Sequence, residues 1–177
     1  MKKVVVFGGS GFLGSYVADE LTRRGYDVVI ADLKESRYLD NGQTYFACDI
    51  MDPAAVATAT KEEIYRDADI ITLHTPLTDL THHLINHETL AQMKPTAFVI
   101  NTARGPIIDG DALKQALIEG VIAGAALDVY ESEPPEDREL LGLPNLFCTP
   151  HIGGNADEAV MAMGLSAIHH LKEFFGK

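Results

Sequence analysis

Short apolar runs alternate with amphipathic stretches along most of the chain. The runs consist largely of Val, Ile, Leu, Ala and Phe, which is typical of strands that are buried on both faces of a sheet. They lie at residues 4–7, 27–32, 44–48, 69–73, 97–101, 121–127 and 146–148. The pattern therefore predicts seven short strands, separated by segments that hold helices or loops.

Helical periodicity follows the first of these strands. Leu13, Val17 and Leu21 recur at positions i, i+4 and i+8, with Phe12 and Tyr16 beside them. Residues at that spacing share one face of an α-helix. We therefore expect an amphipathic helix that Gly25 ends after Arg23 and Arg24.

Three more helices are predicted further along the chain. Asp52 and Pro53 are a cap and a first-turn residue for a helix over 52–67. Asp109 caps a second helix, which Gly120 closes, and a third is expected over 157–175. The apolar faces are formed by Leu113, Ala116 and Leu117 in the second of these helices and by Val160, Met163, Ala167, Leu171 and Phe174 in the third.

Strands that alternate with helices predict an α/β fold with a parallel sheet covered on both faces. Because crossover connections are right-handed, few topologies remain. A doubly wound Rossmann sheet with strand order 3-2-1-4-5-6 and a seventh strand fits best. The Pro-rich stretch 131–144 is expected to be a surface loop rather than a linker, so we predict one domain over residues 1–177.

Composition narrows the possible partners. The chain has 177 residues and a net charge of −12. This balance argues against nucleic acid or an anionic membrane as a partner, and any bound phosphate must be held by backbone amides. No apolar run reaches the roughly 18 residues of a membrane span, and the start does not read as a signal peptide. We expect a cytoplasmic protein in which Cys48 and Cys148 are reduced thiols, with a disulfide as the alternative.

A glycine-rich loop, FGGSGFLG, follows the first strand. Gly9, Gly11 and Gly14 form a G-x-G-x-x-G pattern that opens a helix, and Asp32 ends the next strand. That context predicts a dinucleotide site, in which backbone amides meet the diphosphate and the carboxylate accepts the ribose hydroxyls. Because Asp32 would repel a 2′-phosphate, NAD is favoured over NADP. The alternative is a tight turn and a strand cap without a ligand.

The first third of the chain carries a second pattern. The stretches GGSGFLGSYV, VVIAD and CDIMD resemble the extended short-chain dehydrogenases of the sugar-nucleotide epimerase group, over residues 1 to about 57. The resemblance adds Gly8, Phe12 and Leu13 to the cofactor loop and implies that Asp49 and Ile50 flank the adenine. Asp49 is alternatively a turn residue. That family needs a Tyr-x-x-x-Lys pair, and none of the tyrosines has a lysine four residues later, so epimerase chemistry is excluded.

From about residue 65 onward the sequence pattern is a different one. The stretches DADIITLHTPLTDLTHHLI, NTARGPIIDGDAL, ALDVYESEPP and LPNLFCTPHIGG resemble the D-2-hydroxyacid dehydrogenases. The resemblance implies that Arg104, Glu133 and His151 are catalytic. A guanidinium can bind a carboxylate and polarise a keto oxygen, a histidine can donate a proton to that oxygen, and a carboxylate can orient the ring. Taken singly, the arginine could be a surface charge and the histidine a turn residue.

The same resemblance implies further contacts with the cofactor. Asp128 is expected to hold the nicotinamide amide. The other residues expected to line NAD are Thr75, Pro76, Thr102, Ala103, Arg104, His151, Gly153 and Gly154. No metal site is expected. The pairs His82-His83 and His169-His170 lie outside these motifs and are interpreted as solvated helix faces, with metal binding as the alternative.

Two departures from the second family shape the interpretation. Its members carry a substrate domain, which is expected to be absent here, and its last helix leads back towards that domain. Its glycine loop is replaced by the epimerase-like one. We therefore predict a chimera of two parents, segments 1–57 and 65–177, joined near residues 57–66. Deliberate construction is the leading explanation and natural recombination the alternative.

These features favour an NAD-binding domain without useful turnover of its own, because Arg104 and His151 would act in open water. One alternative is an NAD-dependent D-2-hydroxyacid oxidoreductase, acting on a small 2-keto or 2-hydroxy acid, whose cleft is completed by a dimer mate or a partner chain. Another is a scaffold that no longer binds NAD. The chain is expected to be a monomer or a homodimer.

Overall fold

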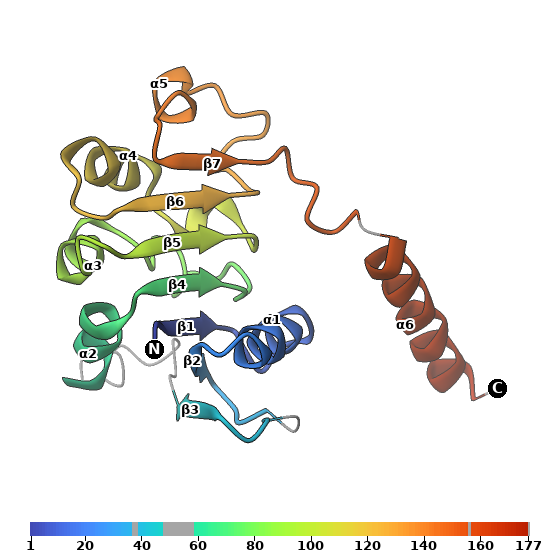
Figure 1. The fold of residues 1–177 in the computed structure, drawn as a ribbon. Coiled ribbons are helices and arrows are strands. Elements are labelled where there is room, and N and C mark those ends of the chain that lie inside the picture. Colours follow the sequence, from blue (N-terminus) through green and yellow to red (C-terminus); the bar gives the residue numbers. More distant parts are fainter. Residues whose placement is uncertain (37–38, 48–58, 156, 177) are drawn as a thin grey trace.

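A computed structural model describes residues 1–36, 39–47, 59–155 and 157–176. A parallel sheet of seven strands forms its centre, in the order β3-β2-β1-β4-β5-β6-β7 (Figure 1). The predicted α/β fold and strand order are therefore confirmed. The strands are β1 Lys3–Phe7, β2 Asp27–Asp32, β3 Gln43–Ala47, β4 Ile70–Leu73, β5 Phe98–Asn101, β6 Gly124–Leu127 and β7 Leu146–Cys148.

Helices and turns connect the strands. The helices are α1 Phe12–Arg23, α2 Ala59–Asp67, α3 His87–Gln92, α4 Gly110–Glu119, α5 Arg138–Leu141 and α6 Asp157–Phe175, with a 3-10 turn at Gly105–Ile107. Asp109 caps α4 by accepting a hydrogen bond from the Ala112 amide, and Gly120 ends it in the left-handed conformation, as predicted. The predicted start of α2 at Asp52 and Pro53 lies outside the described residues.

The strand register sets where ligands can bind. Phe7 pairs with Leu73, Leu73 with Asn101, Asn101 with Leu127, and Leu127 with Cys148. The carboxyl ends of these strands therefore form one edge. Open parallel sheets bind ligands at this edge, close to the point where the strand order reverses, which is between β1 and β4 here.

The core is uneven across the sheet. A large apolar cluster, which includes Phe7, Ile71 and Leu113, fills the space around β4, β5 and β6. A smaller cluster beneath α1 consists of Val4, Val6, Ala18, Val28 and Ile30. Among the described residues, most of the buried apolar side chains therefore lie around β4, β5 and β6.

The expected apolar face of α1 is confirmed only in part. Leu21 packs against the cluster beneath α1 and Val17 is half-buried, whereas Leu13 is about half exposed and Phe12 and Tyr16 are more exposed still. The fully buried residues of the helix are Gly14 and Ala18. Small residues lie closest to the sheet because α1 must approach the glycine loop closely.

Three other boundaries differ from the sequence predictions. Residues 121–123 do not extend β6, because the Val121 amide bonds back to Ala116 and Ile122 is buried in the connection from α4. The expected loop at 131–144 contains α5, whose first turn is capped by Asp137. The short helix α3, capped by Asn86, was not predicted.

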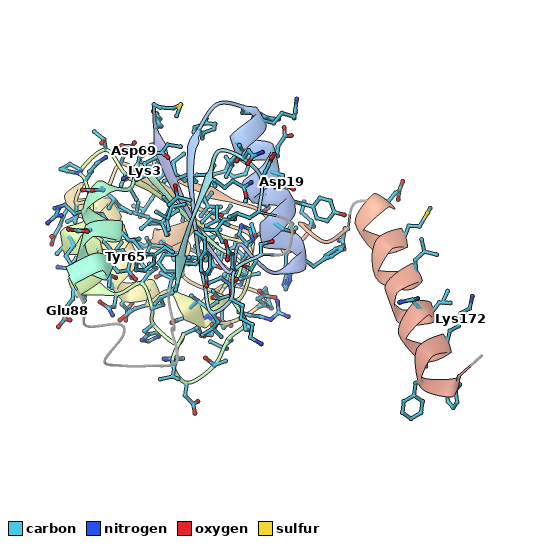
Figure 2. The ribbon with its side chains drawn as sticks, turned by 90° about the horizontal axis from the view of Figure 1, so that it is seen from below. Lys3, Asp19, Tyr65, Asp69, Glu88 and Lys172 are labelled. Atoms are coloured by element: carbon cyan, nitrogen blue, oxygen red, sulfur yellow. The ribbon has the colours of Figure 1, made fainter. Side chains whose placement is uncertain are left out.

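The last helix has the predicted bounds, 157–175, but stands apart from the body (Figure 1). Its side chains extend into open space on the sides that Figure 2 shows, where Lys172 is labelled. Within the described part of the chain, no helix combines the length and the apolar character that a bilayer span requires.

Candidate functional site

The glycine loop lies at the carboxyl end of β1 and is held by close backbone contacts. Gly8 has φ +77° and its amide donates to the Ala31 carbonyl over 2.9 Å. A Cβ at Gly8 would come within 2.7 Å of the His74 backbone carbonyl, and one at Gly14 would overlap the Gly8 carbonyl oxygen. Packing inside the protein therefore requires both glycines.

Gly11 has a different role in the loop. A Cβ there would meet only the Gly8 carbonyl oxygen, at 3.2 Å, so the protein itself scarcely demands glycine at this position. Gly11 is also the N-cap of α1 and provides no side-chain cap. The first amides of α1 are therefore available to an anion, and the missing side chain leaves room for it to approach.

Asp32 lies at the end of β2 beside this loop. Its Oδ2 accepts a hydrogen bond from the Ser10 amide over 2.9 Å, and its Oδ1 accepts one from the Leu33 amide over 2.7 Å. The Ser10 hydroxyl donates to the Lys34 carbonyl over 2.6 Å. These bonds fix the carboxylate against the glycine loop, where the G-x-G-x-x-G pattern requires it. Asp49 and Ile50, the other two residues expected near the adenine, lie outside the described residues.

A cavity of about 520 Å³ opens between the glycine loop and the ends of β4 and β5. Thr75 is buried in its wall, and within the described residues the Thr75 hydroxyl has no hydrogen-bond partner. An unpaired buried hydroxyl beside a cavity is the kind of group that a ligand satisfies. The lining residues are Leu13, His74, Thr75, Pro76, Leu77, Thr102, Ala103 and Arg104.

Arg104 follows β5 on a loop that a buried amide holds in place. The fully buried Asn101 donates from Nδ2 to the Arg104 carbonyl over 2.9 Å and accepts from the Ala103 amide over 3.0 Å. The Arg104 side chain is exposed, and its Nη1 donates to the Ala103 carbonyl. Apart from this bond, the guanidinium is exposed beside the cavity that Arg104 lines, where its other N–H groups can donate to an anion.

Glu133 and His151 are joined by a hydrogen bond. His151 Nδ1 lies 2.8 Å from Glu133 Oε2, and the other carboxylate oxygen accepts from the Tyr130 amide over 3.1 Å. The hydrogen bonds from His151 and then from Tyr130 hold the pKa of Glu133 below its usual range. The carboxylate fixes one ring nitrogen, so the other nitrogen is left for a substrate.

His151 adopts φ +55°, which is unusual for a residue other than glycine, and a buried carboxylate holds its loop. Asp128 Oδ1 accepts from the Thr149 hydroxyl over 2.5 Å and from the Ile152 amide over 2.9 Å, and Oδ2 accepts from the Gly153 amide over 2.8 Å. Burial raises the pKa of Asp128, but these bonds together lower it further, so the pKa lies below its usual value.

The structure thus shows a structural role for Asp128 that the sequence did not suggest. Its carboxylate holds the loop that carries His151, in addition to the contact with the cofactor that the family resemblance implies. A Cβ at Gly153 would lie 2.8 Å from this carboxylate, whereas one at Gly154 would meet no atom within 4 Å. Arg104 lines the cavity and the Glu133–His151 pair does not, so two sub-sites stand at the same edge of the sheet.

His74 is a site residue that sequence reasoning missed. Its ring lines the cavity, with Nε2 3.0 Å from the Thr72 hydroxyl and Nδ1 3.4 Å from the Thr102 hydroxyl. Burial lowers its pKa to about 4, so the ring is neutral at pH 7. The sequence signal that could have identified His74 was its position directly after the apolar strand β4 and before Thr75 and Pro76. His82 and His83 stack in a turn before α3 rather than on a helix face.

Comparisons with known proteins agree on one family. The family model described as "D-isomer specific 2-hydroxyacid dehydrogenase, NAD binding domain" matches residues 1–153. A putative 2-hydroxyacid dehydrogenase from Haemophilus influenzae is 41% identical over 171 residues, which cover 94% of this chain and 50% of that protein.

Solved structures agree. A glyoxylate reductase from Paecilomyes thermophila superimposes with a TM-score of 0.80 at 31% identity, over 97% of this chain and 48% of the other. The NAD-complexed D-isomer specific 2-hydroxyacid dehydrogenase from Lactobacillus delbrueckii superimposes with a TM-score of 0.77 at 29% identity, over 99% of this chain and 54% of the other. The chain therefore spans about half the length of each of these three relatives.

The matches bear on the predicted chimera. One family model spans both predicted segments without a break, and the Haemophilus relative aligns with 94% of the chain. The comparisons therefore give no support to a separate short-chain dehydrogenase origin for residues 1–57 or to a join near residues 57–66. They fit better with the alternative of an oxidoreductase of the D-2-hydroxyacid type.

Proposed function

Because the chain belongs to the D-isomer specific 2-hydroxyacid dehydrogenase family through its NAD binding domain, we propose that it forms the cofactor and proton-transfer half of an NAD-dependent oxidoreductase. The substrate class is a small 2-keto or 2-hydroxy acid. The observation that carries this proposal is the 2.8 Å contact between His151 and Glu133 at the edge of the sheet that also holds the glycine loop.

The residues present fit NAD. The loop around Gly8 and Gly14 leaves no space for a Cβ, Gly11 opens on the uncapped start of α1, and Asp32 is fixed beside it. The diphosphate would lie on the α1 amides and the adenosine ribose on Asp32. The nicotinamide would face the cavity beside Thr75. When bound, NAD supplies the hydride acceptor or donor of the reaction.

The chain's own residues supply the remaining chemistry. Arg104 binds the substrate carboxylate through two hydrogen bonds and polarises the keto oxygen. His151 donates a proton from Nε2 to that oxygen in reduction and removes it in oxidation. Glu133 keeps the imidazole in the orientation that this transfer requires. Asp128 and Asn101 hold the two loops that carry these groups.

The proposed catalytic side chains are exposed to solvent in this chain. The His151 side chain is 49% exposed, the Glu133 side chain is 39% exposed, and Arg104 is also exposed. Charges that act in water stabilise a transition state less than charges in an enclosed cleft. We therefore propose that a second protein surface, from a partner chain or a second copy, completes the cleft. A cytoplasmic location remains part of this proposal.

The test is NADH oxidation with glyoxylate, pyruvate or hydroxypyruvate. Purified chain should oxidise NADH, and His151→Ala and Arg104→Ala should each lower kcat/KM by 100-fold or more, while both variants stay folded in a thermal melt. His87→Ala, an exposed histidine on α3, is the matched control and should keep full activity. Activity that survives in His151→Ala would overturn the proposal.

A second candidate follows from the same exposure. If the chain binds NADH but shows no turnover with any of the three acids, it is an NAD-binding module without catalysis of its own. That result would overturn the proposed activity of this chain and leave the cofactor site intact.

A further inference from the structure

The loop that carries Glu133 rests on the turn that follows Arg104. A Cβ at Gly105 would overlap the Tyr130 carbonyl group and would lie 2.5 Å from the Glu131 amide nitrogen. Gly105 is buried, so the two backbones touch where no side chain separates them. The segment of the proposed substrate clamp and the segment of the proposed proton-transfer pair are therefore joined by a direct backbone contact.

His83 makes a second attachment between these segments. Its Nε2 lies 3.1 Å from Glu131 Oε1, and its Nδ1 lies 3.8 Å from Asp109 Oδ2. Because a carboxylate only accepts hydrogen bonds, Nε2 carries the proton that is donated to Glu131. Asp109 is itself held as the cap of α4, where it accepts from the Ala112 amide over 3.0 Å. The imidazole thus spans a fixed carboxylate and the carboxylate at the start of the exposed loop.

The backbone of His83 is held in place as well. Its amide donates to the Pro106 carbonyl over 2.9 Å, and its carbonyl accepts from Asn86 Nδ2 over 3.0 Å. It adopts φ +51°, a conformation that residues other than glycine seldom adopt. Pro106 directly follows Gly105, so both attachments of the loop are made to the same turn.

The position of Glu133 depends on these attachments. Residues 131–134 are exposed, so buried apolar packing does not fix them. The Glu133 carboxylate accepts from the Tyr130 amide and lies against His151, and both of these bonds are made within the site itself. The tether at Glu131 is therefore what relates Glu133 to the rest of the protein on this side of the loop.

We propose that His83 is a positioning residue for the reaction. Its contact with Glu131 sets where Glu133 lies, and Glu133 in turn sets the orientation of the His151 ring relative to Arg104. His83 has no chemistry of its own in this role, so the role rests on the proposed function of the site. A contact that only stabilised the turn before α3 would instead lower the free energy of unfolding and leave the His151 ring unchanged.

Steady-state kinetics with NADH and the acid that the wild type reduces provide the first test. The side chain in His83→Asn is too short to reach Glu131, and asparagine tolerates a positive φ, so the backbone is not strained further. kcat should fall about fivefold, which is the size expected of a partly exposed contact, while the KM for NADH stays the same. His87→Asn, the same change at an exposed histidine of α3, is the matched control and should keep wild-type kcat. Unchanged kcat in His83→Asn would overturn the proposal.

Partner variants test whether His83 acts through Glu131 and His151. Glu131→Ala should lower kcat as much as His83→Asn does, and the double variant should be no slower than either, because both changes break the same contact. Glu131→Gln keeps an oxygen that accepts from His83 and should retain most of the wild-type kcat. In a His151→Ala background, His83→Asn should have no further effect. A full fivefold loss in that background would contradict a role through His151.

A readout that needs no turnover separates the role of His83 from the proposed function. Long-range proton–nitrogen NMR spectra of the full chain, recorded where the His151 ring is neutral, report which ring nitrogen carries the proton. Wild type should hold it on Nδ1, facing Glu133, and His83→Asn should shift the spectrum towards that of Glu133→Ala. If the wild type reduces none of the acids, the proposed function fails and this spectrum still decides the role of His83. A His151 spectrum that is the same in wild type and His83→Asn overturns that role.

Discussion

The glycine loop and the His151 loop lie at the same edge of the sheet but are built in opposite ways. The glycine loop is held by backbone contacts and by the absence of side chains, with Gly14 lying directly on the Gly8 carbonyl. The His151 loop is held by a buried side chain, because Asp128 accepts three hydrogen bonds from residues 149–153. The first loop therefore tolerates no added atoms at Gly8 or Gly14, and the second tolerates no lost acceptor.

The largest effect is expected at Gly14. The added Cβ of Gly14→Ala would overlap the Gly8 carbonyl oxygen, so α1 or the loop must move. Overpacking of this kind costs about 3 kcal/mol, and the displaced loop should lose NAD. Denaturant unfolding and calorimetric titration with NAD would measure the two effects.

Gly11→Ala is the matched control for the glycine loop. Its Cβ meets a single atom at 3.2 Å, so the free energy of unfolding should change by less than about 1 kcal/mol. The methyl group should nevertheless obstruct the diphosphate and weaken NAD binding at least tenfold. Equal losses of stability in the two variants would contradict a loop in which Gly14 serves packing and Gly11 serves the ligand.

The next effect is expected at Asp128. Asp128→Ala leaves the Ile152 and Gly153 amides and the Thr149 hydroxyl without their acceptor, which should lower the free energy of unfolding by about 2–3 kcal/mol. Hydrogen exchange at the Ile152 and Gly153 amides should accelerate. The exposed Asp79→Ala serves as control and should change neither quantity. Unchanged exchange at both amides would show that the carboxylate does not hold the loop.

His74 gives a smaller effect that depends on pH. Burial lowers its folded pKa to about 4, below the usual 6.5, so the unfolded chain binds the proton more tightly. The neutral His74 ring therefore makes its full contribution to the free energy of unfolding above pH 6.5. That contribution is lost as the pH falls towards 4. Between pH 7 and pH 5 the loss is about 2 kcal/mol. His74→Gln should remove this part of the acid destabilisation, and identical pH profiles for the two proteins would contradict a buried neutral ring.

The smallest effect on stability is expected at the Glu133–His151 pair. Both side chains are more than a third exposed, so solvent screens the pair and Glu133→Gln should change the free energy of unfolding least of these variants. Because the pKa of Glu133 is lowered, its contribution exists above the ordinary value of 4.5 and disappears as pH falls through the depressed value. A loss in denaturant unfolding as large as that of Asp128→Ala would mean that the pair supports the fold rather than the reaction.

Features that depend on local sequence patterns could be predicted, and features that depend on close packing could not. Strand order, the glycine loop, the α4 caps and the bounds of α6 follow from local patterns, and all are confirmed. The buried face of α1 was only partly right, because close packing at the glycine loop buries Gly14 and Ala18 and leaves Leu13 half exposed. The predicted start of β6 was wrong because residues 121–123 belong to the connection from α4, where they are apolar because they pack against the core. The spacing of apolar residues alone does not show whether a residue is buried by a strand, by a helix or by a connection between them.

The candidate site divides in a similar way. Motifs located Arg104, Glu133 and His151, and the structure brings the last two together. The loop-holding bonds of Asp128 and Asn101 and the ring contacts of His74 join residues on different strands. Such bonds depend on register, which no local pattern encodes. The roles that the family resemblance assigns to the cofactor residues stay predictions.

The central claim is that NAD binds on the glycine loop of this chain, and calorimetric titration of the folded protein tests it most directly. We expect one saturable site per chain whose affinity falls at least tenfold in Gly11→Ala, although that variant unfolds at nearly the wild-type denaturant concentration. A cooperatively folded wild-type chain that gives no saturable heat with millimolar NAD would contradict the claim.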